Sequence, residues 1–220
     1  LNYLEKFLDF NKINQLFDFG SGTGCLGYLI KKNYEKIKIS SAESDDNCKK
    51  ILKERKYKNY ENINEINEKF DLITCLHSLE HLTDLSIIQN FKSLAKKGSY
   101  LFLEVPNCEF NSKFKLRPYD SPHLMFFTKE SFQKIAKKYS LEILDISYCS
   151  IPLEENFKNM NYAKKKYENW QKGKIKNFLK SSLRKFLKRV KIFKTSENKE
   201  KKNYQENDKN LSNLRVLFKI

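Results

Sequence analysis

The sequence predicts an α/β fold with a mostly parallel sheet. Up to about residue 150, short apolar runs alternate with longer segments of helical periodicity, which is the pattern of βαβ units. A glycine-rich run, Gly20-Ser21-Gly22-Thr23-Gly24, stands where a first strand gives way to a first helix. The chain of 220 residues is long enough for one such domain and an appendage.

The first half of the chain begins with a strand at 15–19 that runs directly into the glycines. A helix follows to about residue 32, because apolar residues recur there at helical spacing. The run at 70–76 is the clearest strand, since it is apolar apart from one early acid, as expected for a central parallel strand. Between these, we predict a strand at 37–42, a helix at 46–56 and a weak strand at 60–66.

The second half continues the alternation. A helix is predicted at 84–96, Gly98 gives a turn, and the strand at 100–105 is stopped by Pro106. Residues 107–127 are expected to form an irregular loop. Thr128 should cap a helix that includes 131–139. Further strands are predicted at 141–146 and, after a long interruption, at 214–220.

The interruption carries most of the net charge of +16. Residues 163–202 hold 16 Lys or Arg against 3 Asp or Glu, whereas residues 1–162 hold 24 against 22. Within it, 174–193 has the pattern of a basic amphipathic helix, and 195–210 is polar enough for a disordered linker. We therefore divide the chain into a domain of residues 1–150 plus 213–220 and a basic insert of residues 151–212.

The basic helix at 174–193 has three interpretations. Packing of its apolar stripe on the domain is the default, and an anionic membrane surface is the next. Nucleic acid is the weaker alternative, because Lys outnumbers Arg and no aromatic run suits base stacking.

Five scattered cysteines never form a C-x-x-C pair, so no metal site is expected from them. No apolar run is long enough to cross a bilayer, and the first residues lack the pattern of a signal peptide. We expect a cytoplasmic protein, peripheral to the membrane if the basic helix binds lipid.

A nucleoside-binding site is predicted at the glycines. The strand–glycine–helix junction presents backbone N–H groups and a positive helix end, and Glu43 ends the second strand, where a carboxylate can accept both hydroxyls of a ribose. Two cofactors fit this pattern, because Gly22-x-Gly24-x-x-Gly27 also matches the dinucleotide fingerprint. The end of the strand at Phe19 favours the register Asp18-x-Gly20-x-Gly22-x-Gly24.

In this register the chain resembles the class I S-adenosylmethionine-dependent methyltransferases over roughly residues 15–150. The resemblance rests on four sequence motifs that occur in the family's order. They are Asp18 to Gly24, Glu43, the run 70–73 leading to Leu79-Glu80-His81-Leu82, and Leu103-Glu104-Val105-Pro106-Asn107. The phrase Pro122-His123-Leu124-x-Phe126-Phe127-Thr128 looks like a metabolite-directed branch of the family.

The resemblance implies a Rossmann-like sheet of seven strands, mostly parallel, with the last strand inserted antiparallel beside the sixth and with helices on both faces of the sheet. It also implies S-adenosyl-L-methionine as cofactor. Asp18 and the backbone from Gly20 through Ser21 and Gly22 to Gly24 would hold the methionine part, and Glu43 the ribose. Asn64 or Glu65 would meet the adenine, and His77 is a further expected cofactor contact. After the third strand the sequence lacks the clear acid and small-residue pair that is usual in the family, and the long basic insert between the sixth and seventh strands is a further departure.

Catalysis requires alignment of the acceptor and, for a hydroxyl, removal of a proton. His81 is the first candidate for the base and His123 the second, with Glu80 or Tyr119 as acceptor contacts. The predicted function is O-methylation of a small metabolite, a sugar or a glycan or lipid precursor. The alternatives are an RNA methyltransferase that uses the basic insert, an NAD-dependent oxidoreductase, and a non-catalytic binding protein on the same fold.

Overall fold

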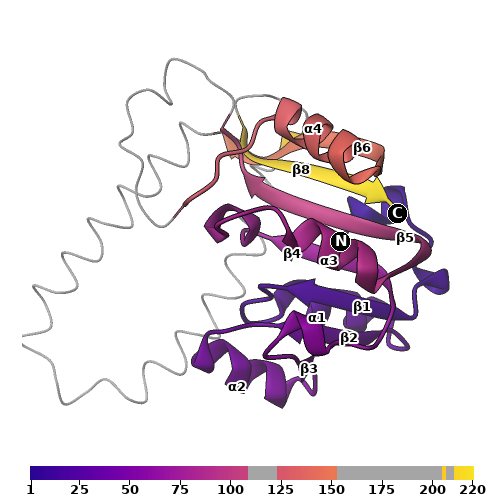
Figure 1. Cartoon of the computed structure of the whole chain (residues 1–220). Helices are drawn as coiled ribbons and strands as arrows, with labels where there is room; N and C mark the ends of the chain where they lie inside the picture. Colours follow the sequence, from indigo (N-terminus) through magenta and orange to yellow (C-terminus); the bar gives the residue numbers. More distant parts are fainter. Residues whose placement is uncertain (109–122, 153–204, 207–210) are drawn as a thin grey trace, which may run out of the picture. The chain divides into compact units, whose positions relative to one another are not determined.

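The computed structural model describes residues 1–108, 123–152, 205–206 and 211–220 (Figure 1). They belong to two compact units, one formed by Leu1–Ser147 with Asn213–Ile220 and the other by Tyr148–Ser212. The predicted basic helix at 174–193 lies outside the described residues. Of the predicted linker at 195–210, only residues 205–206 are described, and they form a short strand.

Within the described residues, eight strands form one sheet in the order β3-β2-β1-β4-β5-β8-β6-β7. The strands β1 to β5 pair in parallel, and β8 pairs antiparallel with β5, as Figure 1 shows. The two-residue β7 pairs with the far end of β6 and is additional to the seven predicted strands. The mostly parallel sheet with a late antiparallel strand beside the sixth is therefore confirmed. The bounds are β1 Gln15–Phe19, β2 Lys38–Ala42, β3 Lys58–Asn59, β4 Phe70–Leu76, β5 Ala95–Pro106, β6 Glu142–Pro152, β7 Gln205–Glu206 and β8 Leu211–Lys219.

In the described part of the chain, four α-helices connect these strands, close to their predicted places. Side chains fix the first turns of α2 and α4: Asp45 accepts two backbone N–H bonds at the start of α2, and Thr128 forms a capping box with Ser131 at the start of α4. Among the described residues, no helix combines the length and the apolar character that a membrane crossing requires. The helices are α1 Cys25–Asn33, α2 Asp46–Glu54, α3 Ile87–Leu94 and α4 Lys129–Tyr139, with 3-10 turns η1 Leu4–Lys6, η2 Phe10–Lys12, η3 Ile63–Glu65 and η4 Leu79–His81.

The predicted third strand at 60–66 was wrong. The strand is β3, two residues long and earlier in the chain. The N–H of Tyr60 still bonds to the carbonyl of Ser41, but the side chain of Asn62 then accepts the N–H of Asn64 and turns the chain into η3. An Asn side chain that bonds its own local backbone competes with strand pairing, and the apolar spacing alone does not reveal this.

The predicted turn at Gly98 was also wrong, because β5 already begins at Ala95 and runs through it. Gly98 has a positive φ of 77°, and the β4–β5 pairing shifts register between Phe70 and Leu72. The glycine thus marks an irregularity inside a long strand, which is a common position for glycine in a sheet.

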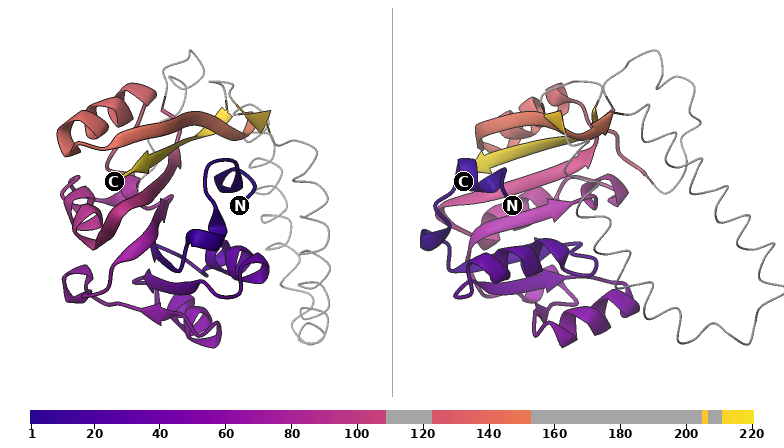
Figure 2. Two further views of the ribbon diagram at one scale, coloured as in Figure 1. Left: turned by 90° about the vertical axis from the view of Figure 1, so that its right-hand side faces the viewer. Right: turned by 180° about the vertical axis from the view of Figure 1, so that it is seen from behind.

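The two faces of the sheet carry separate apolar layers, because strand side chains alternate between faces. On one face, Leu16 and Leu72 pack with α1, α2 and the N-terminal segment, including Tyr3 and Leu4. On the other face, Phe19 contacts Phe91 of α3, and Phe218 contacts Phe132 of α4. Figure 2 shows the N-terminal segment and α4 on opposite sides of the sheet. Helices cover both faces, as predicted.

Candidate active site

The site lies where the parallel strands end. Since β1, β2, β4 and β5 run in the same direction, their carboxyl ends meet at one edge of the sheet. Gly20 follows β1, Glu43 follows β2, His77 follows β4 and Asn107 follows β5. Residues that are distant in sequence are thereby brought to one edge.

The glycine loop has the backbone conformation that its sequence predicts. Gly20, Gly22 and Gly24 all have positive φ, between 53° and 72°, which favours glycine. A Cβ on Gly20 would lie 2.0 Å from Oγ of Ser78, whereas a Cβ on Gly22 would meet nothing within 4 Å. The loop therefore packs tightly against the end of β4 at its first glycine and faces open space at its second.

Glu43 is held beside this loop by backbone donors. Its Oε2 accepts the N–H of Gly22 at 2.6 Å, and its Oε1 accepts the N–H groups of Ser44 and Asp45 at 2.8 and 2.9 Å. A carboxylate oxygen has two lone pairs, so Oε2, which accepts one bond, can still accept a ligand hydroxyl. The structure thus brings the predicted ribose acceptor and the glycines together.

Asn59 supports Glu43 from β3 and was not predicted from the sequence. Its side-chain N–H donates to the carbonyl of Glu43 at 3.2 Å, and its Oδ1 accepts the hydroxyl of Ser41 at 3.0 Å. The misplaced third strand concealed this residue, because a strand at 60–66 leaves Asn59 in a loop.

Asp18 is the most unusual acid of the site. It is 4% exposed, and its Oδ1 accepts the hydroxyl of Thr74 at 2.6 Å. Burial raises the pKa of Asp18 to about 6; the bond from Thr74 opposes this rise and the nearby charge of Glu43 adds to it. No ion pair to Asp18 is recorded among the described residues.

These features fit S-adenosylmethionine, which carries an ammonium, a sulfonium and a ribose. The buried Asp18 would gain a cationic partner, and the buried Oγ of Ser21, which has no hydrogen-bond partner in the described part of the chain, would gain a polar contact. The space before Gly22 admits a ligand close to the backbone. The fit therefore rests on groups that are unsatisfied within the protein.

His77 lies at the same edge, but its ring contacts β5 rather than the glycines. Nε2 is 3.3 Å from Oε1 of Glu104, and Nδ1 is 3.6 Å from Oε1 of Glu80. The bond to Glu104, and then the contact with Glu80, raise the pKa of His77 to about 9. Its φ of 51° is strained for a residue with a side chain, and such strain is common at functional sites. Its role as a cofactor contact stays a prediction.

Asn64 is exposed on η3, where its backbone N–H bonds to the side chain of Asn62. Within the described residues, no recorded contact joins its side chain to Glu43 or to the glycine loop. The adenine contact at Asn64 or Glu65 stays a prediction.

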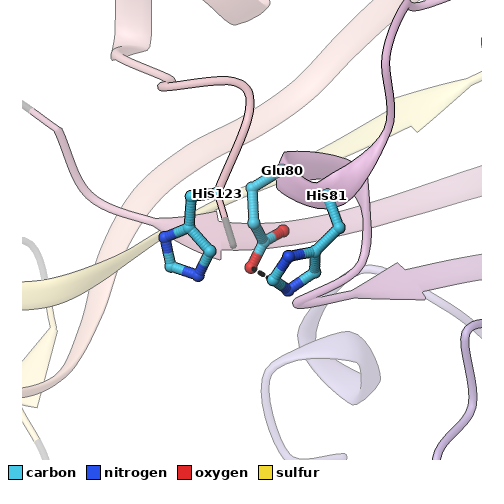
Figure 3. A group of neighbouring side chains, drawn as sticks. All are labelled: Glu80, His81 and His123. Carbon is cyan, nitrogen blue, oxygen red and sulfur yellow. Dashed lines mark ion pairs between the residues drawn. The ribbon is translucent and has the colours of Figure 1, made fainter. Parts of the chain in front are cut away.

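The two catalytic candidates do come together. The rings of His81 and His123 have centroids 4.9 Å apart and stand edge to face. The buried carboxylate of Glu80 lies with them, 4.0 Å from Nε2 of His81 (Figure 3). Tyr119, a predicted acceptor contact, lies outside the described residues.

Backbone bonds hold this arrangement. The carbonyl of Glu80 accepts the N–H groups of both Leu124 and Met125, at 2.8 and 3.0 Å. Asn107 forms a β-bridge with Phe127, which lays the same segment along the end of β5. His123 is thereby placed beside η4, which carries His81.

Solved structures share this fold. They include coclaurine N-methyltransferase bound to N-methylheliamine and SAH, with 13% identity, 100% of this chain and 71% of that chain covered, and a TM-score of 0.63. A SAM dependent methyltransferase from Archaeoglobus fulgidus has 16% identity, coverage of 100% and 90%, and a TM-score of 0.58. The O-methyltransferase from a trans-AT PKS multienzyme of Brevibacillus brevis, in complex with S-adenosyl-L-homocysteine, has 14% identity, coverage of 96% and 68%, and a TM-score of 0.55. A search of curated proteins found no match.

A protein-family model described as a methyltransferase domain matches residues 2–146. The match decides between the two cofactors that the glycines allow. The match of Gly27 to the dinucleotide fingerprint has a packing explanation. A Cβ on Gly27 would lie 3.2 Å from Ile39 and Tyr57, so this glycine allows close packing of the helix on the sheet. The chain belongs to the methyltransferase domain family, as a class I enzyme that depends on S-adenosylmethionine.

Proposed function

We propose that this enzyme methylates a hydroxyl oxygen of a small molecule. The observation that carries the proposal is the Glu80–His81–His123 group, which stands at the same sheet edge as the glycine loop and Glu43. A hydroxyl is a poor nucleophile until it loses its proton, so an O-methyltransferase needs groups that promote this loss. The paired imidazoles meet that need, and we propose that they promote removal of the acceptor proton.

On the cofactor side, Asp18 would bind the ammonium group, Glu43 the ribose hydroxyls, and the loop from Gly20 to Gly24 the backbone of the methionine part. When bound, S-adenosylmethionine supplies a methyl group on a sulfonium, whose C–S bond breaks as the bond to the acceptor oxygen forms. The protein's own contribution is to align the acceptor with that methyl group and to exclude water.

We extend the proposal to a sugar, or to a glycan or lipid precursor, as the acceptor. Leu124 and Phe126 support an acceptor with apolar surface, because they are 59% and 42% exposed directly after His123. A cytoplasmic setting is proposed as well. The five cysteines are all free thiols, which suits a reducing compartment.

The first test is calorimetric titration with S-adenosylmethionine, S-adenosylhomocysteine and NAD. We expect the first two to bind and NAD not to. Gly22→Asn is the variant that tests the location of the site. It should fold normally, because Asn tolerates a φ of 53° and its side chain would enter the open space where the cofactor is expected. This variant should unfold like the wild type while its affinity for S-adenosylhomocysteine falls at least about tenfold, or about 1.4 kcal/mol. Binding of NAD instead would contradict the proposal.

The second test concerns the acceptor atom. Formation of S-adenosylhomocysteine is followed with paired acceptors that carry either a hydroxyl or an amine on the same carbon skeleton. Turnover of the hydroxyl member supports O-methylation. Turnover of the amine member alone would show that the enzyme methylates nitrogen.

A further inference from the structure

Three ligand-bearing side chains converge at one point beside the sheet edge. The ligand atoms of Glu80, His81 and His123 all lie within 4.8 Å of one another. Figure 3 shows the Glu80 carboxylate directed between the two imidazole rings. Glu80 and His81 come from η4, whereas His123 comes from the segment that leads to α4.

The buried carboxylate of Glu80 is incompletely satisfied. Its side chain is 2% exposed, and its Oε2 has no hydrogen-bond partner among the described residues. Burial of a carboxylate oxygen without a partner is costly, and a catalytic role or a bound ion is among the explanations for such groups in native proteins. A cation bound at Oε2 would satisfy this carboxylate.

Two imidazoles and one carboxylate are a suitable ligand set for a divalent transition-metal cation. Three protein ligands leave coordination positions open, which is the arrangement of catalytic rather than structural sites. Ligand atoms at about 2.1 Å from a tetrahedral metal lie about 3.4 Å apart. The side chain of His81 is 38% exposed, so a small rotation can close the remaining distance.

Backbone hydrogen bonds hold the segments that carry these three side chains next to one another. The carbonyl of Glu80 binds the two N–H groups that follow His123, and the N–H of Cys108 bonds to the carbonyl of Phe127. Three segments that are far apart in the sequence are thus fixed relative to one another. Preorganised first ligands are what a metal site requires.

We propose that Glu80, His81 and His123 bind a divalent transition-metal cation, which in turn binds the acceptor oxygen. The catalytic part of this inference rests on the proposed O-methylation. The cation makes the bound hydroxyl more acidic, and its proton leaves to water at the exposed side of His81. The oxygen then forms its bond to the methyl carbon while the C–S bond breaks and its electron pair stays on sulfur. The histidines promote proton loss as ligands and not as direct bases.

The test begins with metal binding alone. The full chain is stripped with a chelator and titrated with Zn²⁺ by calorimetry and with Co²⁺ by visible absorption. We expect one equivalent to bind. Glu80→Gln, His81→Phe and His123→Phe should each weaken binding at least about tenfold. Glu130→Gln is the control, because Glu130 is an exposed acid paired with Lys134 on α4, and it should bind metal like the wild type.

Thermal unfolding of each variant shows whether it is folded, and titration with S-adenosylhomocysteine shows whether the cofactor site is intact. Equal metal binding by wild type and all three ligand variants, or none by the folded wild type, would overturn the metal site. If stripped enzyme methylates a hydroxyl acceptor at the full rate, the cation has no catalytic role, but the proposed function stands. If metal binds at the three side chains and no hydroxyl is methylated, the proposed function fails while the metal site remains.

Discussion

Gly20 and Ser78 illustrate how closely two loops of the site are packed. The space that a Cβ on Gly20 would need is filled by the side chain of Ser78, whose hydroxyl donates to the carbonyl of Gly20 at 3.2 Å. The glycine is thus required twice, once by its φ of 63° and once by its neighbour. At Gly22, two residues later, only the positive φ requires glycine, because a Cβ there would contact no other atom within 4 Å.

We therefore predict that Gly20→Ala lowers the free energy of unfolding by at least about 2 kcal/mol, from backbone strain and steric overlap together. In the double variant with Ser78→Gly, the overlap is removed and only the strain remains. A double-mutant cycle by urea unfolding should then show a coupling of about 1–3 kcal/mol. Additive effects of the two substitutions would mean that the contact is not tight.

Asp18 makes the stability of the cofactor-free protein depend on pH. The pKa of its carboxyl is raised from 3.8 to about 6, so folding disfavours the ionised form. Below pH 3.8 both states are protonated and no cost arises. Stability is lost as the pH rises through this range, and above pH 6 the cost reaches about 3 kcal/mol at 1.36 kcal/mol per pKa unit.

The matched variant is Asp18→Asn, which keeps an oxygen acceptor for Thr74 but cannot ionise. In urea unfolding without cofactor, the stability of this variant relative to the wild type should increase by about 3 kcal/mol between pH 4 and pH 8. Its affinity for S-adenosylmethionine should fall, because it lacks the carboxylate that we propose binds the ammonium group. A stability difference that does not vary with pH would rule out a raised pKa.

At the scale of elements, β8 contributes more to the core than its late place in the chain suggests. It pairs antiparallel with β5 over seven residue pairs from Tyr100–Lys219 to Pro106–Asn213. Phe218 is fully buried against Phe132 of α4, with ring centroids 6.4 Å apart, while Lys219 next to it is exposed.

We predict that Phe218→Ala lowers the free energy of unfolding by about 3–5 kcal/mol, the usual cost of removing a buried aromatic ring. Lys219→Ala, the control at the exposed neighbouring residue, should change it by no more than about 0.5 kcal/mol. Equilibrium urea unfolding of both variants is the measurement. Similar losses in the two would place the strand in a different register.

Elements with strong local signals could be predicted from the sequence, and those decided by tertiary contacts could not. The strands at 15–19 and 70–76 have the predicted bounds, because a short and mostly apolar run followed by a turn favours a buried strand. The weak strand at 60–66 failed, since local bonds of Asn62 replaced pairing. β5 extends beyond its predicted start because β4 accepts an irregular register beside Gly98.

At the scale of the whole molecule, one half of the site could be predicted from the sequence and the other half could not. The proposed cofactor half could be predicted, because Asp18 and the glycines are close in the sequence and the end of the second strand lies beside them in a parallel sheet. The acceptor half depends on the bonds from Leu124 and Met125 to the carbonyl of Glu80, which no spacing in the sequence indicates. The two histidines could be proposed one by one, but their meeting around a buried carboxylate could not.

The position of β8 has a consequence for the synthesis of the chain. β8 lies between β5 and β6 in the sheet, yet the ribosome makes it after both, and after the whole Tyr148–Ser212 unit. Until then, the backbone edge of β5 has no partner on that side, and open edges of this kind pair readily with other chains. The nascent chain thus passes through a long stage in which one edge of β5 is unpaired, and this is the stage at which a chaperone would have to protect it.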